Sequence, residues 1–226
     1  ALLKAGANPS LSTGDDFNYA PLHAACSAGS EACAKLLIDA GAKVDARAKN
    51  DQVALHVSAS PGLVEMLIAA GASVNIPTND KGMTPLQYCV ENKNGIGCVN
   101  PLIKAKANVN AVNKGGVQPL HAAAQLGDAP VVKVLLEAGA EKETAGPHGF
   151  TPLYCAAMKG HGKCMELLLA AGTNPCKAIN AGFTPLHALC EHGHSELLSL
   201  ILDAKADVNA VAMEATPLYL ACQQGH

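Results

Sequence analysis

A four-residue motif recurs along the whole chain at a nearly constant spacing. Its fullest form is Thr184-Pro185-Leu186-His187, and six further copies align with it. These copies are Ala20-Pro21-Leu22-His23, Val53-Ala54-Leu55-His56, Thr84-Pro85-Leu86-Gln87, Gln118-Pro119-Leu120-His121, Thr151-Pro152-Leu153-Tyr154 and Thr216-Pro217-Leu218-Tyr219. The second residues of successive copies are 33, 31, 34, 33, 33 and 32 positions apart. A period of this length predicts a stacked array of structural repeats.

Each repeat encodes two short antiparallel helices. Thr184 can cap a helix with its hydroxyl, and Pro185 suits the first helical position because its φ is already restricted. His192-Gly193-His194 marks a turn, and apolar residues at helical spacing in 197–202 predict a second, amphipathic helix. In another copy, Gly139 stands where a left-handed residue ends the second helix, and a hairpin-like loop follows. One such unit cannot bury both faces of its helix pair, so it must be stabilised by its neighbours.

The chain resembles the ankyrin repeat family over all 226 residues. The resemblance rests on the T-P-L-H motif, the Gly-His pair between the helices and the leucine-rich second helix that ends in Gly-Ala. It implies an all-α ankyrin repeat solenoid of about seven repeats, with a partial repeat at each end. The expected boundaries, in one continuous array, are 1–16 (partial), 17–49, 50–80, 81–114, 115–147, 148–180, 181–212 and 213–226 (partial). Because both ends fall inside a repeat, we expect a monomeric array within a longer chain.

Composition and charge exclude several classes of partner. Apolar residues make up 49% of the chain, aromatic residues only 3%, and tryptophan is absent, which suits thin, closely packed helices. The net charge is −3, and the 16 basic residues include a single arginine, Arg47, so nucleic-acid binding is not expected. No apolar run approaches the roughly 18 residues that cross a bilayer. We therefore expect no membrane segment.

The cysteine pattern predicts a reducing compartment, the cytoplasm or the nucleus. Nine cysteines are too few for a disulfide scaffold, and no glycosylation motif occurs. Eight are expected to be small buried residues of the helices: Cys26, Cys89, Cys155, Cys190 and Cys222 in first helices, and Cys33, Cys98 and Cys164 at the start of second helices. Cys176 lies in a loop and is the thiol expected to be reactive.

The stretch from Val53 to Lys106 departs from the regular pattern. Residues 57–62 replace the end of a first helix and its Gly-His turn, and the next unit carries an insertion around 92–95. Proline inside a helix costs about 3 kcal/mol or more. With Asn100 as cap and Pro101 as first residue, the second helix of that unit is predicted to shrink to a turn or two. The stretch is either tolerated drift in the array or a hinge or docking site.

Two lysines occupy positions that glycine fills in the other repeats. Lys106 and Lys205 follow the second helices of their units, where the chain is expected to become left-handed. A residue other than glycine pays roughly 1 to 2 kcal/mol for that conformation. Both positions are therefore predicted to carry backbone strain.

Most residues that suggest chemistry are explained by the repeat. His23, His56, His121 and His187 belong to the motif, where the resemblance implies that the ring bonds the threonine hydroxyl and nearby backbone. His161, His194 and His226 belong to the Gly-His turns. Cys190, Glu191, His192 and His194 are residue types of a zinc site, but two of them fill structural positions. Lys114-Gly115-Gly116 lacks the rest of a phosphate-binding loop. No metal, no cofactor and no enzymatic activity is expected.

The resemblance places partner binding on a concave face made by the hairpin tips and the exposed side of the first helices. The candidates at the tips are Phe17, Tyr19, Met83, Val117, Phe150 and Phe183, and those on the helices are Leu126, Met158, Glu191 and His192. All three phenylalanines lie at tips, and exposed aromatic residues with polar neighbours are typical interface anchors. The alternative is that the phenylalanine before each motif packs on its own repeat.

The resemblance also implies a modification. Asparagine in the Val-Asn position of a hairpin can be hydroxylated in ankyrin repeats from animals, and Asn75, Asn110 and Asn209 match that position. Leu67 and Leu102 stand eight residues before the first two, as the family favours, whereas Ile201 departs from this at the third. The alternative role of these asparagines is turn formation.

The leading interpretation is a non-catalytic module that binds a partner protein across the concave face. One alternative is a substrate-recruiting subunit of a ubiquitin ligase, which would need a ligase-docking segment beyond His226. Another is the regulatory segment of a larger enzyme or channel. A purely mechanical scaffold would bind no partner above background.

Overall fold

The computed structural model describes residues 1–92 and 95–226, and these residues form a helical protein with twelve α-helices and no named strand. The chain divides into two compact units, Ala1–Lys114 and Gly115–His226, which are described separately as unit 1 and unit 2. The predicted all-α repeat fold is therefore confirmed. The single continuous array and its repeat boundaries stay a prediction.

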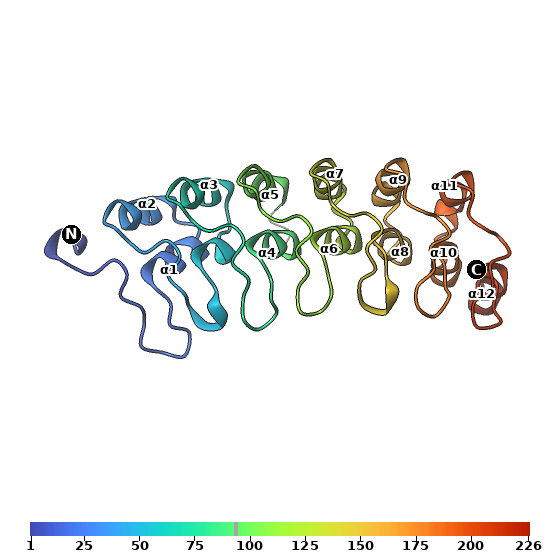
Figure 1. Cartoon of the computed structure of the whole chain (residues 1–226), viewed down its shortest axis with the longest axis horizontal. Helices are drawn as coiled ribbons and strands as arrows, with labels where there is room; N and C mark the ends of the chain where they lie inside the picture. The colour runs from blue at the N-terminus through green and yellow to red at the C-terminus, as the bar shows by residue number, and fades with distance from the viewer. Residues whose placement is uncertain (93–94) are drawn as a thin grey trace. The chain divides into compact units, whose positions relative to one another are not determined.

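Unit 1 contains two rows of helices. The first helices of its repeats are α1 (Pro21–Ser27), the 3-10 helix η3 (Ala54–Val57) and α4 (Pro85–Glu91), and the second helices are α2 (Glu31–Asp39), α3 (Pro61–Ala69) and α5 (Gly95–Lys104). Two further 3-10 helices are η1 (Leu3–Ala5) and η2 (Lys49–Asp51). Neighbouring members of each row pack on one another, and the connecting loops project beyond the first helices (Figure 1).

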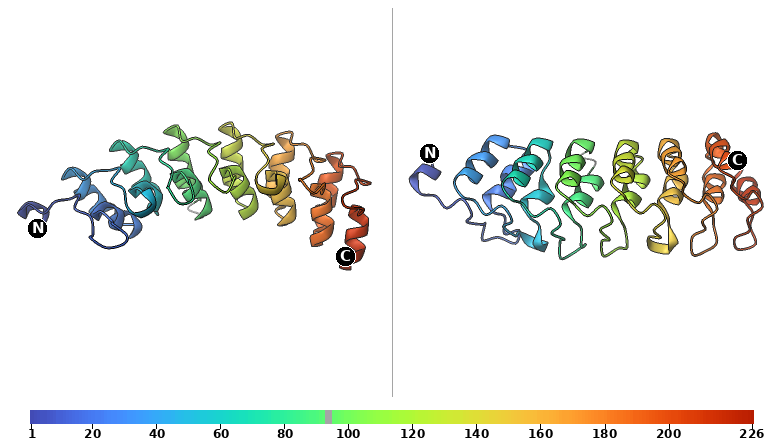
Figure 2. Two further views of the ribbon diagram at one scale, coloured as in Figure 1. Left: turned by 60° about the horizontal axis from the view of Figure 1, so that its bottom comes forward. Right: turned by 45° about the horizontal axis from the view of Figure 1, so that its top comes forward.

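Unit 2 repeats the same arrangement more regularly. Its first helices are α6 (Pro119–Leu126), α8 (Pro152–Met158), α10 (Pro185–His192) and α12 (Pro217–Gln224), and its second helices are α7 (Ala129–Glu137), α9 (Gly162–Ala170) and α11 (Leu198–Asp203). The 3-10 helices η4 (Pro147–Gly149) and η5 (Ser195–Leu197) complete it. The right view of Figure 2 shows the two helix rows of this unit, with hairpin loops extending from the first-helix row.

The helices begin where the motif predicts. The side chains of Thr84, Thr151, Thr184 and Thr216 each accept a hydrogen bond from a backbone N–H in the first turn, and proline occupies the position after each cap. Ser30, Ser60 and Asp128 do the same for α2, α3 and α7. These caps satisfy donors that a helix of seven to nine residues would otherwise leave unpaired.

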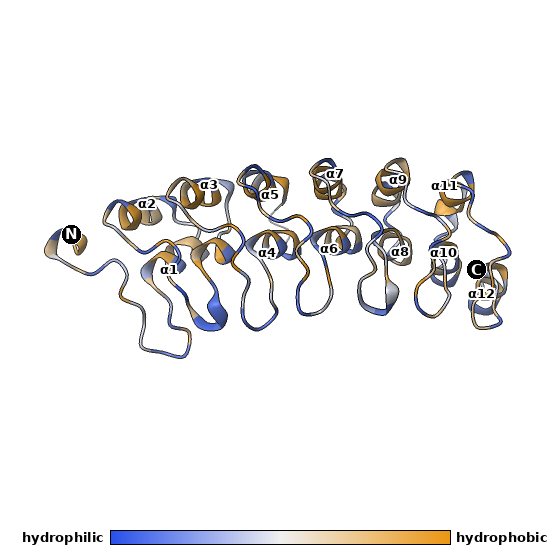
Figure 3. Cartoon of the chain, viewed as in Figure 1, coloured by the Kyte–Doolittle hydropathy of each residue, from blue (hydrophilic) through white to orange (hydrophobic). Residues whose placement is uncertain are grey.

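The core lies between the two helix rows of each unit. The leucine of the motif is at most 3% exposed in six copies: Leu22, Leu55, Leu86, Leu120, Leu153 and Leu186. Full burial of such a side chain contributes roughly 1.5 to 3 kcal/mol. Hydrophobic residues occur throughout both helix rows, and hydrophilic residues are frequent in the hairpins (Figure 3). Leu218, the seventh copy, is 71% exposed on the outer side of α12.

The second helix of the irregular unit is longer than its sequence predicts. The predicted turn or two beginning at Pro101 is wrong, because α5 runs from Gly95 to Lys104 with Pro101 inside it. Cys98, Val99 and Leu102 are fully buried, and only a continuous helix places all three against the neighbouring helices. That burial offsets the proline penalty of about 3 kcal/mol.

The other irregularities of unit 1 are partly described. The shortened first helix is confirmed, since η3 is a four-residue 3-10 helix followed by an extended Ser58 and the next cap at Ser60. The insertion around 92–95 lies partly outside the described residues. Whether this stretch acts as a hinge or a docking site stays a prediction.

Three of the eight cysteines expected to be buried are not. Cys33 and Cys222 are exposed, and Cys190 is half-buried. Cys33 lies one turn before Leu36 on α2, and Leu36 is 60% exposed. Cys222 lies on α12, where Leu218 is 71% exposed. The cysteine positions that were expected to be buried therefore differ in exposure from repeat to repeat.

The two lysines in glycine positions are left-handed, with φ of 67° at Lys106 and 69° at Lys205. We expect Lys106→Gly and Lys205→Gly each to stabilise the fold by about 0.5 to 1 kcal/mol, because relief of strain exceeds the added entropy of the unfolded chain. Thermal unfolding followed by circular dichroism measures this. Lys104→Gly is the matched control, since Lys104 is helical and its replacement should destabilise the fold. A lower melting temperature for Lys205→Gly would contradict the assignment of strain.

Candidate protein-binding face

Four motif histidines connect each first helix to the following hairpin. In each, Nδ1 accepts a hydrogen bond from the backbone N–H of the cap residue three positions earlier, at distances of 3.1 to 3.4 Å. The ring is therefore protonated on Nε2, which donates to a carbonyl of the next loop. The pairs are His23 to Gln52, His56 to Met83, His121 to Thr144 and Phe150, and His187 to Ala215.

The sequence predicted bonds of these rings to nearby backbone, and the structure identifies that backbone as the cap N–H and a carbonyl of the next loop. The expected bond to the cap hydroxyl occurs at His187, whose Nδ1 lies 2.8 Å from Thr184 Oγ1. Burial lowers the pKa of all four histidines, so the rings stay neutral. A neutral ring can accept one hydrogen bond and donate the other. The four rings hold the hairpins on the first helices.

Two motif copies in which another residue replaces histidine behave differently from each other. Gln87 reproduces the bridge, because its Oε1 accepts from the Thr84 N–H at 3.0 Å and its Nε2 donates to the Ala111 carbonyl at 3.2 Å. Tyr154 replaces the histidine in α8, and its ring instead packs beside Phe150, with centroids 4.9 Å apart. The Tyr154 ring is 5% exposed and is therefore buried at this position.

The Gly-His turns form a second set of ties between repeats. His161 Nε2 bonds the Gln125 carbonyl at 3.0 Å, and His194 Nε2 bonds the Met158 carbonyl at 3.4 Å. Gly160, with φ of 72°, leaves room for the His194 ring, since a Cβ there would lie 2.6 Å from Cε1 of that ring. The glycine therefore serves both a left-handed turn and a close approach.

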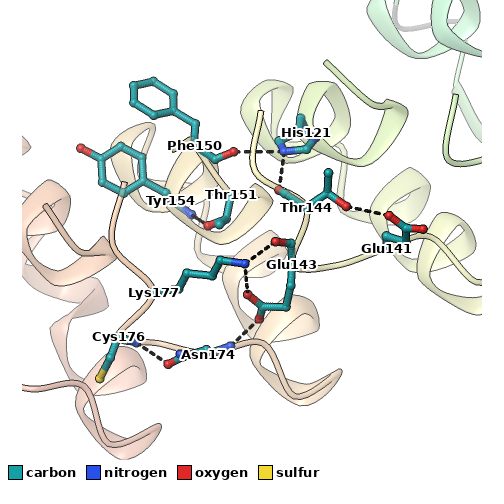
Figure 4. Close-up of polar contacts among 10 residues, drawn as sticks. All are labelled: His121, Glu141, Glu143, Thr144, Phe150, Thr151, Tyr154, Asn174, Cys176 and Lys177. Atoms are coloured by element: carbon teal, nitrogen blue, oxygen red, sulfur yellow. Dashed lines mark hydrogen bonds and ion pairs between the residues drawn. The ribbon is translucent and has the colours of Figure 1, made fainter. Parts of the chain in front are cut away.

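Hairpins of unit 2 are also connected directly to one another (Figure 4). Lys177 forms an ion pair with Glu143 at 3.4 Å, and the Asn174 N–H donates to the same carboxylate at 2.6 Å. The side chain of Asn174 in turn accepts from the Cys176 N–H at 2.9 Å. Cys176, the thiol expected to be reactive, is half-buried, and its Sγ lies 3.6 Å from the Lys205 carbonyl. These contacts fix the loops that present the candidate binding residues.

The most exposed of the predicted apolar binding residues is Phe17, at 58% exposure. It lies in the long connection between η1 and α1, which Asp15 organises by accepting hydrogen bonds from the Thr13 hydroxyl at 2.6 Å and the Phe17 N–H at 3.0 Å. These bonds lower the pKa of Asp15, the Thr13 hydroxyl having the largest effect. The carboxylate therefore holds the loop in one conformation.

Beside Phe17 lies a hollow of about 360 Å³, here called the finger pocket. Its lining includes Leu11, Asp15, Phe17, Tyr19, Pro21 and Ala24. Tyr19 is half-buried and stacks on the His23 ring with centroids 5.4 Å apart. Leu11 is 70% exposed and was missed in the sequence, where its only signal is a large apolar residue within a polar connection. The finger pocket brings two predicted residues, Phe17 and Tyr19, into one apolar site.

Met83 does not belong to the candidate surface. Its predicted place at an exposed tip is wrong, because the residue is 2% exposed. Its carbonyl accepts from His56 Nε2 at 3.2 Å, and its N–H donates to Thr78 Oγ1 at 3.2 Å. Met83 directly precedes the cap residue Thr84, and these bonds hold its backbone against the repeat. Its flexible side chain packs in the protein interior.

Phe150 and Phe183 occupy the equivalent position in unit 2 and are half-buried. Phe183 contacts the His187 ring edge-on at 5.5 Å, and Phe150 packs on Tyr154 as described above. Both therefore pack partly on their own repeat, the alternative noted for the sequence, while leaving part of each ring in solvent. Figure 4 shows the Phe150 ring projecting from its loop.

The remaining candidates fall into two groups. Val117, Leu126 and Met158 are half-buried, and Glu191 and His192 are exposed at the end of α10. His192 Nδ1 bonds the Ala188 carbonyl at 3.0 Å, and its ring stacks on His194 with centroids 6.2 Å apart. Within unit 2, Phe150, Met158, Phe183, Glu191 and His192 all belong to the first-helix row or its hairpins.

The three asparagines proposed for hydroxylation differ in environment. Asn75 is exposed, but its side chain bridges to the next hairpin, donating to the Lys106 carbonyl at 3.1 Å and accepting from the Asn108 N–H at 2.7 Å. Asn110 is half-buried, and Asn209 is exposed. The backbone N–H of Asn209 donates to Asp207 at 2.9 Å. Asn75 therefore connects two hairpins, which differs from the turn role expected for it, and hydroxylation stays a prediction for all three.

The described residues contain no group of three or more His, Cys, Asp or Glu side chains placed to hold a metal ion. Burial raises the pKa of the Cys155 thiol to about 12 and that of Cys164 to about 11, which disfavours their thiolates. Cys98 differs, since a hydrogen bond with Cys89 lowers its pKa, but both thiols are at most 1% exposed. No helix in the described part of the chain is long and apolar enough to cross a membrane.

The repeated helix pairs and their ties define a stacked helical-repeat protein. A family model described as ankyrin repeats matches residues 1–78, 86–179 and 175–226. The chain belongs to the ankyrin repeat family. Ankyrin repeat domains are generally protein-interaction modules.

Two solved structures resemble the chain closely. The human ASB11 ankyrin repeat domain superposes with a TM-score of 0.82 and 27% identity, over 90% of this chain and 92% of that one. The ankyrin repeat domain of Bcl-3 superposes with a TM-score of 0.79 and 25% identity, over 91% of this chain and 95% of that one.

Curated relatives match only part of their own length. The mouse B-cell lymphoma 3 protein homolog is 33% identical over 58% of this chain and 30% of that protein. Human ankyrin repeat and SOCS box protein 16 is 37% identical over 48% of this chain and 24% of that protein. The chain thus corresponds to about a third or less of each of these relatives.

Proposed function

We propose that the chain is a non-catalytic protein-interaction module whose partner binds the surface formed by the hairpin tips and first helices. The finger pocket carries this proposal. It combines an apolar hollow of about 360 Å³ with Phe17 and Leu11 at 58% and 70% exposure, on a loop held by Asp15. Apolar anchors of this kind, ordered before binding, contribute most of the affinity at protein interfaces.

Substitution of the exposed rings tests the assigned face. We expect Phe17→Ala to weaken binding of a selected partner by at least about tenfold, with smaller losses for Phe150→Ala and Phe183→Ala, because these rings are already half-buried. Partners are selected from a library of displayed peptides and domains, and their affinities are measured by calorimetry.

Leu36→Ala is the matched control for this experiment. Leu36 is 60% exposed but lies on the second helix α2, away from the hairpins. Its replacement should leave the affinity unchanged. If Leu36→Ala weakens binding while the three phenylalanine variants bind normally and remain folded, the partner uses the second-helix side and the assigned face is wrong.

A second candidate function is recruitment of substrates to a ubiquitin ligase. It is favoured by similarity to a relative whose name combines ankyrin repeats with a SOCS box. We propose that such a box, in a segment outside these residues, would dock the ligase while the first-helix face holds the substrate. Co-purification of ligase subunits with the full-length protein, and its loss on removal of that segment, would test this role.

We also propose that the module acts in a reducing compartment, the cytoplasm or the nucleus. All nine cysteines are free of disulfides, and five are buried in helices where a thiol serves as a small apolar side chain.

A further inference from the structure

The first-helix row of unit 2 carries a single acidic or basic side chain apart from its histidines. The four helices α6, α8, α10 and α12 contain no Asp, Lys or Arg, and their one carboxylate is Glu191. Glu191 is exposed at the end of α10 and forms no ion pair among the residues that the structure describes. This surface therefore presents one uncompensated negative charge.

Two aromatic residues lie on α8 or directly before it: Phe150 is half-buried and Tyr154 is 5% exposed. Phe150 and Tyr154 lie with centroids 4.9 Å apart and planes inclined by 34°. The phenol oxygen of Tyr154 points away from Phe150 (Figure 4). Burial and the charge of Glu191 raise the pKa of Tyr154 to about 12, so the phenol stays protonated and is close enough to feel the carboxylate. Helices α8 and α10, which carry these groups, pack directly on each other.

Among the described residues, no histidine forms an ion pair with Glu191. His187, four residues earlier on the same helix, uses both ring nitrogens, one with Thr184 and one with the Ala215 carbonyl, and burial keeps it neutral. His192 bonds the Ala188 carbonyl through Nδ1, and His194 bonds the Met158 carbonyl through Nε2. Lys159, the residue directly after α8, also forms no ion pair with Glu191. The Glu191 carboxylate is therefore open to a cation supplied by a partner.

A partner that covers this face removes water from Glu191. An isolated carboxylate loses favourable hydration on burial unless a cation replaces the water. Lysine and arginine suit the site, because their aliphatic stems pack on aromatic faces while their heads reach a carboxylate. Contact of the head with the aromatic rings adds a further attraction.

We infer that the partner segment places one cationic side chain, lysine or arginine, against Glu191, with its aliphatic stem on the half-buried side chains of Phe150 and Met158. This inference rests on the proposed function, since it applies to a partner bound along the first-helix row. It specifies the chemistry of the partner at one position: a basic residue within an otherwise apolar or neutral segment.

A selection experiment tests the inference. Random linear peptides displayed on phage are selected against the full chain, against Glu191→Lys and against Glu196→Lys. Glu196 is an exposed carboxylate five positions further on, in η5, and serves as the matched control. We expect peptides selected by the wild type and by Glu196→Lys to be enriched in one basic position, and those selected by Glu191→Lys to lose that preference.

A double-mutant cycle then measures the contact itself. For one selected peptide, replacing the basic residue by methionine should weaken binding to the wild type at least about tenfold and binding to Glu191→Gln less than about twofold. Equal losses for both proteins, or selected peptides without a basic preference, would overturn the inference.

The same measurements separate this inference from the proposed function. Peptides that need Phe150 but show no basic preference would overturn the cationic contact and leave the binding face in place. Peptides that bind normally to the Phe17, Phe150 and Phe183 variants, or a selection that yields no binder, would overturn both.

Discussion

His121→Ala should reduce the free energy of unfolding by about 3 to 4 kcal/mol. The ring is 3% exposed, and its Nε2 donates to the Thr144 and Phe150 carbonyls at 2.9 and 3.1 Å. Removing it leaves buried backbone groups without a partner and opens a cavity between α6 and the hairpin. Urea unfolding followed by circular dichroism measures the loss.

His121→Gln is the matched variant, because the chain already uses glutamine in this role. Gln87 bridges the Thr84 N–H and the Ala111 carbonyl with bonds of 3.0 and 3.2 Å. We expect His121→Gln to cost less than about 1.5 kcal/mol, since the two hydrogen-bonding functions are kept. Equal losses for the alanine and glutamine variants would show that the bridge contributes little and that ring packing alone stabilises the site.

Much of the fold was predictable because the same helix caps, prolines and motif spacing occur in successive repeats. Caps such as Thr184, prolines such as Pro185 and the spacing of the motif act locally, and the structure bears them out. The prediction at Pro101 was wrong because it considered only the cost of proline inside a helix. The length of α5 is determined by the packing of its apolar residues. Burial of Val99 and Leu102 requires a continuous helix, and no local pattern reports that burial.

The candidate site was less predictable, since exposure depends on contacts between repeats. The sequence places Met83, Phe150 and Phe183 in the same position, yet the first is buried and the other two are half-buried. Leu11 could not be assigned, because only the folded loop brings it beside Phe17. Residues that act within one repeat were predictable, and residues whose role depends on a neighbouring loop were not.

Acid should destabilise the protein over a defined pH range. Burial lowers the pKa of His23, His56, His121 and His187 below the ordinary value of 6.5. Below pH 6.5 the unfolded chain therefore binds protons that the folded chain excludes, so the free energy of unfolding falls as pH decreases towards the folded pKa values. Each histidine contributes up to about 1.4 kcal/mol per pH unit within that range, and the four act together.

Urea midpoints measured between pH 8 and pH 5 should be constant above about pH 7 and fall steeply below 6.5. Other groups with shifted pKa values do not explain this range: Asp15 and Asp80 have pKa values below 3.8, and the raised pKa of Glu91 has the opposite sign. His121→Gln removes one of the four titrating rings and should reduce the slope by about a quarter. A wild-type urea midpoint that does not change between pH 7 and pH 5 would contradict this prediction. It would mean that the rings take up protons in the folded state as readily as in the unfolded chain, although both ring nitrogens are engaged in hydrogen bonds.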